Sequence, residues 1–145
     1  MDKQHTEPFA QALAAYKAAV FTKDADAFAA LYGDDVTVFD MWGAWALHGQ
    51  PAWRAMAVDW FASLGDERVE VDFTAVQTTQ NDGIAAGHAI ATYTAIAADG
   101  KVLRAQSNRI TMILKRADTV WHIIHEHTSA PLDPGSQRVM LDQPG

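Results

Sequence analysis

The fold is decided by one stretch in the second half of the chain, VEVDFTAVQTTQNDGIAAGHAIATYTAIA, at residues 69–97. From Val69 to Phe73, apolar residues alternate with polar ones, which is the period of a strand with one buried face. The turn sequence Asn81-Asp82-Gly83 separates this strand from a second long strand, which runs from Ile84 to Ala97. The stretch therefore predicts an antiparallel hairpin that is covered on one side.

Two further strands are expected after this hairpin. Asp99-Gly100 marks a turn, and a strand follows from Val102 to Lys115. Ala117-Asp118-Thr119 then turns the chain into a last strand, Val120–Ser129. Four consecutive long strands of this kind predict an antiparallel meander.

The first half of the chain has the period of helices instead. Apolar residues recur at spacings of three and four over residues 7–22, which predicts a helix. Asp24 is placed to cap a shorter helix whose inward residues would extend to Leu31 and Tyr32. A third helix is predicted to start at Gly49-Gln50-Pro51, because proline is tolerated at the first helical position.

Short strands are expected between these helices, at Val36–Asp40 and at Trp45–His48. Helices that are segregated from a meander indicate the α+β class. We therefore predict a cone-shaped, curved antiparallel sheet wrapped around helices, with a ligand cavity between the two layers. The expected domain covers residues 1–132, and an irregular tail, rich in proline and glycine, covers residues 133–145.

Composition excludes several classes of function. The 145 residues carry a formal net charge of −7 and no cysteine, so disulfides, thiolate metal sites and thiol nucleophiles are ruled out. Scattered basic residues in an acidic chain argue against a nucleic-acid partner. No apolar run approaches the roughly 18 residues of a membrane span. Since the N-terminus opens with polar residues, we expect a cytoplasmic protein.

Two parts of the sequence resemble a known superfamily. Tyr16, the segment Leu31–Asp40 and His48-Gly49 are similar to the nuclear-transport-factor-2-like superfamily, and within it to SnoaL-like and ketosteroid-isomerase-like proteins. Arg109-Ile110-Thr111 and Val120–Pro131 resemble the association domain of calcium/calmodulin-dependent protein kinase II and its bacterial single-domain relatives. The resemblance covers roughly residues 8–132 and implies a cystatin-like α-β roll. Because this fold carries many functions, the resemblance leaves the activity open.

Asp40 and Tyr16 are the candidate catalytic residues. Asp40 ends an apolar strand face, where partial burial would raise the pKa of a carboxyl group toward that of a general base. Tyr16 shares the apolar face of the first helix, so its hydroxyl should point inward. The ketosteroid-isomerase resemblance implies that Asp40 is the base and that Tyr16 donates a hydrogen bond to the developing oxyanion. The inward aspartic acid of that family falls near Gln106 or Ser107, so its third partner is missing here.

Arg109 is expected to lie in the middle of a strand, where a guanidinium must be paired or must face a pocket. Two hypotheses remain open: a structural pair with Glu126 on the neighbouring strand, or a pocket that binds a carboxylate. The association-domain resemblance implies that the matching arginine lines the cavity and meets anions. Thr128 stands where that domain has a second arginine, and the resemblance also favours Glu126 and Thr128 inside the cavity.

His125 and His127 are two residues apart and so should share one face of a strand. A metal site is not expected, because no carboxylate follows at a suitable spacing and His122 would point to the opposite face. We expect these histidines at a pocket rim or at a dimer interface instead. Strict alternation would place Ile123 on the same face as both of them.

Tryptophans form the last group of candidates. Trp42 and Trp45 should lie at the cavity mouth, where binding an aromatic ligand and simple packing are equally good explanations. Trp53 and Trp60 are seven residues apart on one helical face and are more simply core residues, although Trp53 could also contact a ligand.

Two functions are therefore carried forward from the sequence. One is a cofactor-free acid–base enzyme, of the isomerase or cyclase class, that acts on a small apolar substrate. The other is a non-catalytic module for dimerisation or for binding a ligand, which could be apolar or bear a carboxylate. A homodimer is expected in both cases, because the second face of the sheet alternates with enough apolar residues to need a partner.

Overall fold

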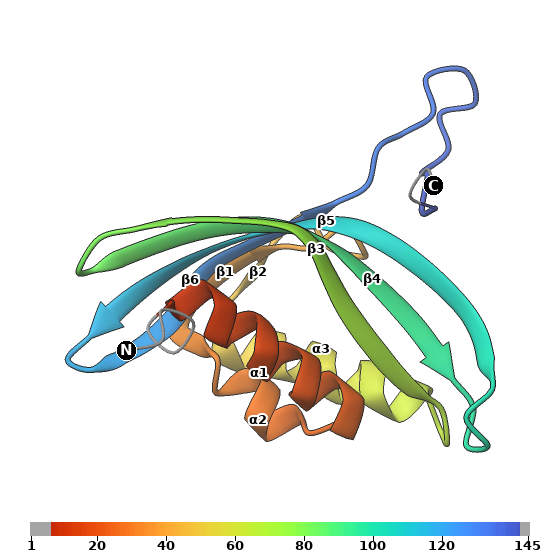
Figure 1. Cartoon of the computed structure of the whole chain (residues 1–145), viewed down its shortest axis with the longest axis horizontal. Helices are drawn as coiled ribbons and strands as arrows, with labels where there is room; N and C mark the ends of the chain where they lie inside the picture. The colour runs from red at the N-terminus through yellow and green to blue at the C-terminus, as the bar shows by residue number, and fades with distance from the viewer. Residues whose placement is uncertain (1–6, 143–145) are drawn as a thin grey trace.

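The computed structural model of the protein describes residues 7–142. Figure 1 shows a curved sheet that arches over a layer of helices, which cover one of its faces. The sheet has six strands in the order β2-β1-β6-β5-β4-β3 and does not close into a barrel. The helices are α1 (Pro8–Thr22), α2 (Ala25–Ala29) and α3 (Gln50–Ser63), and the strands are β1 (Tyr32–Phe39), β2 (Leu47–His48), β3 (Arg68–Gln80), β4 (Ile84–Ile96), β5 (Val102–Ala117) and β6 (Val120–Ser129). The α+β prediction is confirmed.

One pair of strands departs from the predicted antiparallel sheet. β1 runs parallel to β6, with Val38 opposite Glu126 and Phe39 opposite His127. The four pairings from β3 to β6 and from β1 to β2 are antiparallel, as expected. The parallel pair arises because the last strand of the meander, β6, lies beside β1 and runs in the same direction. It matters for function, because it places the end of β1 beside the end of β6.

The three helices begin within one residue of the predicted positions, but α2 is shorter than expected. The Asp24 side chain accepts a hydrogen bond from the backbone nitrogen of Ala27, as an N-cap residue does. The helix ends at Ala29, and Tyr32 begins β1 instead of closing the helix. Gly33 and the two aspartates that follow it are poor helix formers, which explains the early end.

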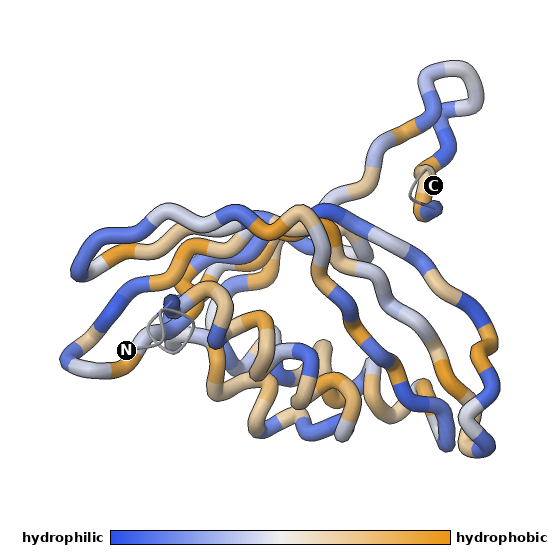
Figure 2. Tube along the Cα trace, in the orientation of Figure 1, coloured by the Kyte–Doolittle hydropathy of each residue, from blue (hydrophilic) through white to orange (hydrophobic). Residues whose placement is uncertain are grey.

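The core lies between the helices and the concave face of the sheet. Phe28 and Trp53 are 0% and 2% exposed, and the rings of Tyr16, Tyr32 and Phe61 pack around Phe28. Trp60 and Leu31, which were expected to be buried, are partly buried against this core. Figure 2 shows how apolar and polar residues alternate along the strands that form this layer.

One glycine is required by the close approach of α1 to the sheet. Gly87 of β4 lies directly against the ring of Phe9, and a Cβ atom at this position would overlap that ring. The missing side chain lets α1 sit close to the strand, which is a common reason for a glycine inside a strand.

A β-bulge in β6 changes which residues face the helices. Ile113 pairs with His125, but the next residue of β5, Leu114, pairs with Ile123, so Ile124 has no partner in β5. The bulge places Ile123 on the same buried face as Glu126. The strict alternation expected for this strand, which grouped Ile123 with the histidines, is therefore wrong.

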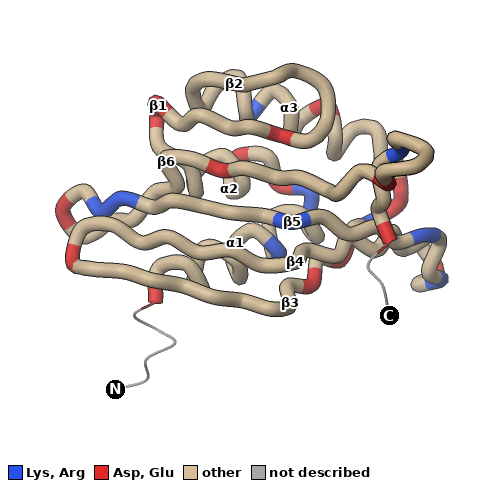
Figure 3. The backbone as a smooth tube through the Cα atoms, turned by 90° about the horizontal axis from the view of Figure 1, so that it is seen from above, with Lys and Arg blue, Asp and Glu red and all other residues tan. Residues whose placement is uncertain are grey.

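The remaining segments lie at the periphery. The predicted short strand at residues 45–48 is reduced to Leu47–His48, and residues 41–46 form a loop. In the tail, Leu132 forms a single bridge with Val139, and the backbone nitrogen of Ser107 donates to the carbonyl of Leu141. Figure 3 shows basic positions spread over both ends and the middle of the sheet, with acidic positions among them. None of the described helices is long and apolar enough to cross a membrane.

Candidate functional site

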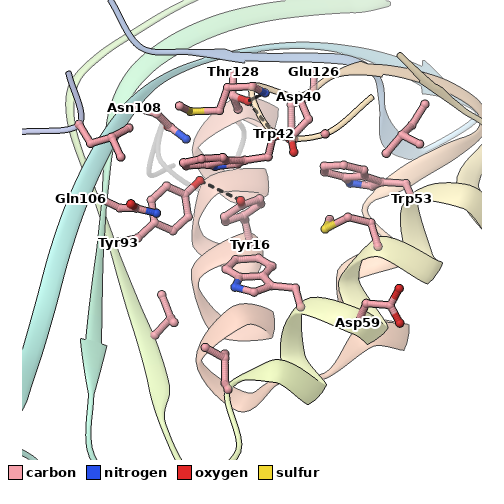
Figure 4. A pocket seen from close by; sticks show the side chains of 18 of the residues that line it. Tyr16, Asp40, Trp42, Trp53, Asp59, Tyr93, Gln106, Asn108, Glu126 and Thr128 are labelled. Atoms are coloured by element: carbon pink, nitrogen blue, oxygen red, sulfur yellow. Dashed lines mark hydrogen bonds between the residues drawn. The ribbon is translucent and has the colours of Figure 1, made fainter. Parts of the chain in front are cut away.

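A cavity of ≈ 720 Å³ lies between the concave face of the sheet and the helices. Figure 4 shows that the labelled side chains converge on it from both layers. Helices α1 and α3, the loop after β1 and the inner sides of β4, β5 and β6 all contribute to its wall. Its polar and aromatic lining residues include Tyr16, Asp40, Trp42, Trp53, Trp60, Tyr93, Asn108, Glu126 and Thr128.

Asp40 lies at the end of β1 and faces the cavity, as the sequence predicts. The Thr128 hydroxyl donates to Asp40 Oδ1 over 2.8 Å, and the Met41 backbone nitrogen donates to Thr128 Oγ1 over 2.9 Å. Partial burial raises the pKa of Asp40 above its ordinary value, although the Thr128 hydroxyl and the backbone N–H groups of Trp42 and Met41 oppose this rise. The carboxyl group is therefore fixed in orientation and is more basic than an exposed aspartate.

Tyr16 reaches the same cavity from α1. It is 4% exposed, and its hydroxyl lies 2.9 Å from the hydroxyl of Tyr93 on β4. Burial raises the pKa of both tyrosines well above the ordinary value, so both are neutral phenols at any physiological pH. Figure 4 shows the two rings meeting at one side of the cavity.

Sequence reasoning missed Tyr93, although a signal was available. The inward positions of β4 are otherwise alanine or glycine, from Ala85 to Ala95. A single large polar residue in such a series is unexpected, because the close packing of α1 on this strand favours small side chains. That contrast marks Tyr93 as a residue with a role in the cavity.

Glu126 is the most deeply buried carboxyl group of the site. It is 1% exposed, and the Tyr32 hydroxyl donates to its Oε1 atom over 2.6 Å. Burial raises the pKa of Glu126 to about 8; the Tyr32 hydrogen bond opposes this rise, and the nearby Asp40 carboxyl adds to it. At neutral pH the side chain is therefore mostly a neutral acid. Glu126 and Thr128 both face inward, as the resemblance implied.

Arg109 does not join these residues, and its expected pair with Glu126 is wrong. Ile110, Met112 and Leu114 are buried on the inner face of β5, so the odd-numbered residues between them point outward. Arg109 is exposed on the outer face, where its Nε donates to the Ser129 hydroxyl over 3.0 Å. Asn108 lines the cavity instead.

His125 and His127 also lie on the outer face, away from the cavity. His125 Nδ1 is 2.7 Å from the carbonyl oxygen of Thr37, and both imidazoles pack edge-on against Phe39. Within residues 7–142, no three His, Asp or Glu side chains form a group that could hold a metal ion.

Three of the tryptophans contribute to the cavity wall. Trp53 is buried at 2% exposure, Trp60 lies two turns further along α3 with its ring against Tyr93, and Trp42 reaches in from the loop after β1. The expectation for Trp45 is wrong, because it is 98% exposed and does not line the cavity.

The sequence of residues 10–133 matches the family model of the SnoaL-like domain. The chain belongs to this family. The SnoaL-like assignment confirms the resemblance that Asp40 and its neighbours indicated. A search of the curated proteins finds no significant match.

Solved structures with the same architecture agree with the SnoaL-like fold. An NTF2-like protein of unknown function from Pseudomonas putida KT2440 is 22% identical, with a TM-score of 0.83, over 100% of this chain and 99% of that one. ActVI-ORFA from Streptomyces coelicolor is 17% identical, with a TM-score of 0.73, over 84% of this chain and 93% of that one. A Xanthomonas campestris protein described as a calcium/calmodulin-dependent protein kinase II association domain is 20% identical, with a TM-score of 0.69, over 87% and 89%. At these identities the solved structures define the fold and not the activity.

Proposed function

We propose that this SnoaL-like protein binds a small, neutral and mostly apolar molecule and acts on it by cofactor-free acid–base chemistry. The observation that carries the proposal is that Asp40 and the Tyr16–Tyr93 pair line the same cavity. Asp40 is the general base, and the tyrosine pair supplies the hydrogen-bond donor for the charge that develops on an oxygen of the substrate.

Asp40 suits the role of a base because it combines fixed orientation with raised basicity. The Thr128 hydroxyl holds one carboxylate oxygen. The raised pKa brings the group closer to the pH at which a general base is most effective, while the backbone N–H groups of Met41 and Trp42 keep its ionised form accessible. A proton taken from a carbon next to a carbonyl group would pass to this carboxylate.

The tyrosine pair suits the role of the donor. The two hydroxyls hold two protons, and the hydrogen bond between them uses only one. The other O–H is available to a ligand oxygen, and it becomes a stronger donor when its neighbour donates to it. An enolate oxygen formed by proton transfer to Asp40 would be stabilised by this group.

Charge inside the cavity favours a neutral ligand. The carboxyl groups of Asp40 and Glu126 face inward. Arg104 lies at the edge, where it is 63% exposed and pairs with Glu67 over 2.7 Å, and Arg109 is on the other face of the sheet. An anion would enter this cavity without a buried cation to meet it, which is costly.

The second candidate is a non-catalytic ligand-binding module. One observation favours it: Gln106 and Ser107 line the cavity near the place where the resemblance implies the inward aspartic acid of ketosteroid isomerases, so no carboxylic acid is there to act as that family's second oxyanion donor. The cavity and its indole walls would serve a binding protein equally well.

Exchange of the α-protons of 1-tetralone in D₂O, followed by proton NMR, separates the two candidates, because it needs only a base and an oxyanion donor. We expect exchange above the buffer rate, a loss of about 10²-fold or more in Asp40→Asn, and a loss of roughly 10²-fold in Tyr16→Phe. Asp34→Asn, on the same strand but exposed, is the matched control and should keep the rate. Binding without exchange would favour the module, and no binding would refute both candidates.

A further inference from the structure

The end of the described chain forms a small hairpin that returns to the sheet. Leu132 forms a β-bridge with Val139, and the Asp133 carboxylate accepts a hydrogen bond from the backbone nitrogen of Ser136 over 2.8 Å. In Figure 1 the chain leaves the end of β6, loops away from the sheet and comes back toward it. The SnoaL-like family model ends at residue 133, so most of this hairpin lies outside the matched domain. Residues 132–141 are called the C-terminal clasp below.

The clasp meets the sheet where β5 has a free edge. β5 and β6 pair no further than Arg109 with Ser129, so the earlier part of β5 has no neighbouring strand on that side of the described sheet. There the backbone nitrogen of Ser107 donates to the carbonyl oxygen of Leu141 over 2.7 Å. Among the described residues, this is the only backbone hydrogen bond between the clasp and the sheet. It fixes the end of the clasp in the place that β6 leaves open.

Leu141 is the residue of the clasp that reaches the cavity. It lines the cavity together with Ser107 and Asn108, and it is partly buried. Val139 and Met140, which precede it, are 41% and 42% exposed. A leucine that is partly buried at the end of an exposed segment owes its burial to the cavity wall. Because this wall lies on the concave side of the sheet, a second copy packed on the outer face would leave Leu141 in place.

We propose that the clasp holds Leu141 in the cavity wall as a specificity-determining residue, which sets the size of the ligand that fits at this end of the cavity. The proposal rests on the proposed function only in so far as the cavity binds a small apolar molecule. An apolar wall recognises a ligand by its shape, and one methylene group more or less in such a pocket changes affinity by about tenfold or more. Leu141 therefore selects among apolar ligands of different size without taking part in the acid–base chemistry.

The test compares two apolar ketones, 1-tetralone, which has two rings, and fluorenone, which has three and carries no α-proton. Calorimetric titration of the full chain gives the ratio of their dissociation constants. Leu141→Ala should shift this ratio about tenfold in favour of fluorenone, because it enlarges the cavity at this end. Leu141→Trp should shift the ratio in the opposite direction, because it fills the same space.

Leu132→Ala is the matched control. It removes the other leucine of the clasp, which is 61% exposed and does not line the cavity, so the ratio should stay unchanged. Circular dichroism checks that each variant is folded. An unchanged ratio in both Leu141 variants, with 1-tetralone still bound, would overturn this proposal and leave the proposed function intact. Absence of ketone binding by the wild type would refute the proposed function and this proposal with it.

A second measurement follows the clasp without any ligand. Amide hydrogen exchange of the full chain, read by NMR, should show the Ser107 amide protected by about tenfold or more. Asp133→Ala, which removes the acceptor of the turn, should reduce this protection and leave that of Ile110, in the paired part of β5, unchanged. A Ser107 amide that exchanges as fast as in an unstructured peptide would show that the clasp is open in solution and would overturn the proposal.

Discussion

Replacing Glu126 by Gln should remove a large pH dependence of the free energy of unfolding. In the unfolded chain this carboxyl group loses its proton near its ordinary pKa of 4.5, whereas in the fold it keeps the proton up to about 8. Between these values the folded state binds more protons than the unfolded state, so the wild type loses stability as the pH rises. At about 1.4 kcal/mol per pH unit, the interval corresponds to about 5 kcal/mol.

Glutamine imitates the neutral acid, because its Oε1 atom can still accept the Tyr32 hydrogen bond that Glu126 receives. We therefore expect the variant to match the wild type near pH 4.5 and to exceed it by several kcal/mol above pH 8. Urea denaturation followed by circular dichroism, repeated across this range, measures the difference. Glu70→Gln on β3, at a partly exposed position, is the control and should leave the slope unchanged. A wild-type stability that does not fall between pH 4.5 and 8 would refute the argument.

Three further outcomes are expected. Asp40→Asn should stabilise the fold at neutral pH and not at pH 3, because a raised carboxyl pKa makes the wild type lose stability as the pH rises above 3.8. Thermal melts of the variant and the wild type that coincide at both pH values would contradict this. Gly87→Ala should lower the free energy of unfolding by about 1–3 kcal/mol, because the added methyl group overlaps the ring of Phe9, and Phe9→Leu should partly restore it. An unchanged midpoint of urea denaturation in Gly87→Ala would be evidence against the contact. The outer sheet face exposes 41% of Phe39 and 37% of Ile124, so we expect a homodimer in sedimentation at about micromolar concentration; a monomer there would count against it.

Periodicity was sufficient to predict most of the fold. The hairpin at Asn81-Asp82-Gly83, the start of α3 and the long strands all follow from short-range patterns. The parallel pairing of β1 with β6 could not be predicted in this way, since it depends on where the meander ends in space. The bulge at Ile124 was also missed, because an extra residue in a strand leaves no marker in its sequence.

The candidate site was predicted in part. The sequence placed Asp40 and Tyr16 in the cavity because Asp40 follows the apolar face of a strand and Tyr16 lies on the apolar face of a helix. Arg109 was misplaced, although the buried Ile110 and its apolar neighbours on β5 indicate that the residues between them point outward. The hydrogen bond from Tyr32 to Glu126 joins residues 94 positions apart, and no local pattern predicts such a contact.

The role of Asp40 as the base depends on the pKa that partial burial gives its carboxyl group, and a titration of that group measures this pKa. In protein labelled with ¹³C at the aspartate carboxyl carbons, the Asp40 resonance is the one that disappears in Asp40→Asn. We predict a titration midpoint above the ordinary value of 3.8, because burial outweighs the hydrogen bonds from Thr128 and the backbone. A midpoint at or below that value would contradict the catalytic account and leave the cavity as a binding site only.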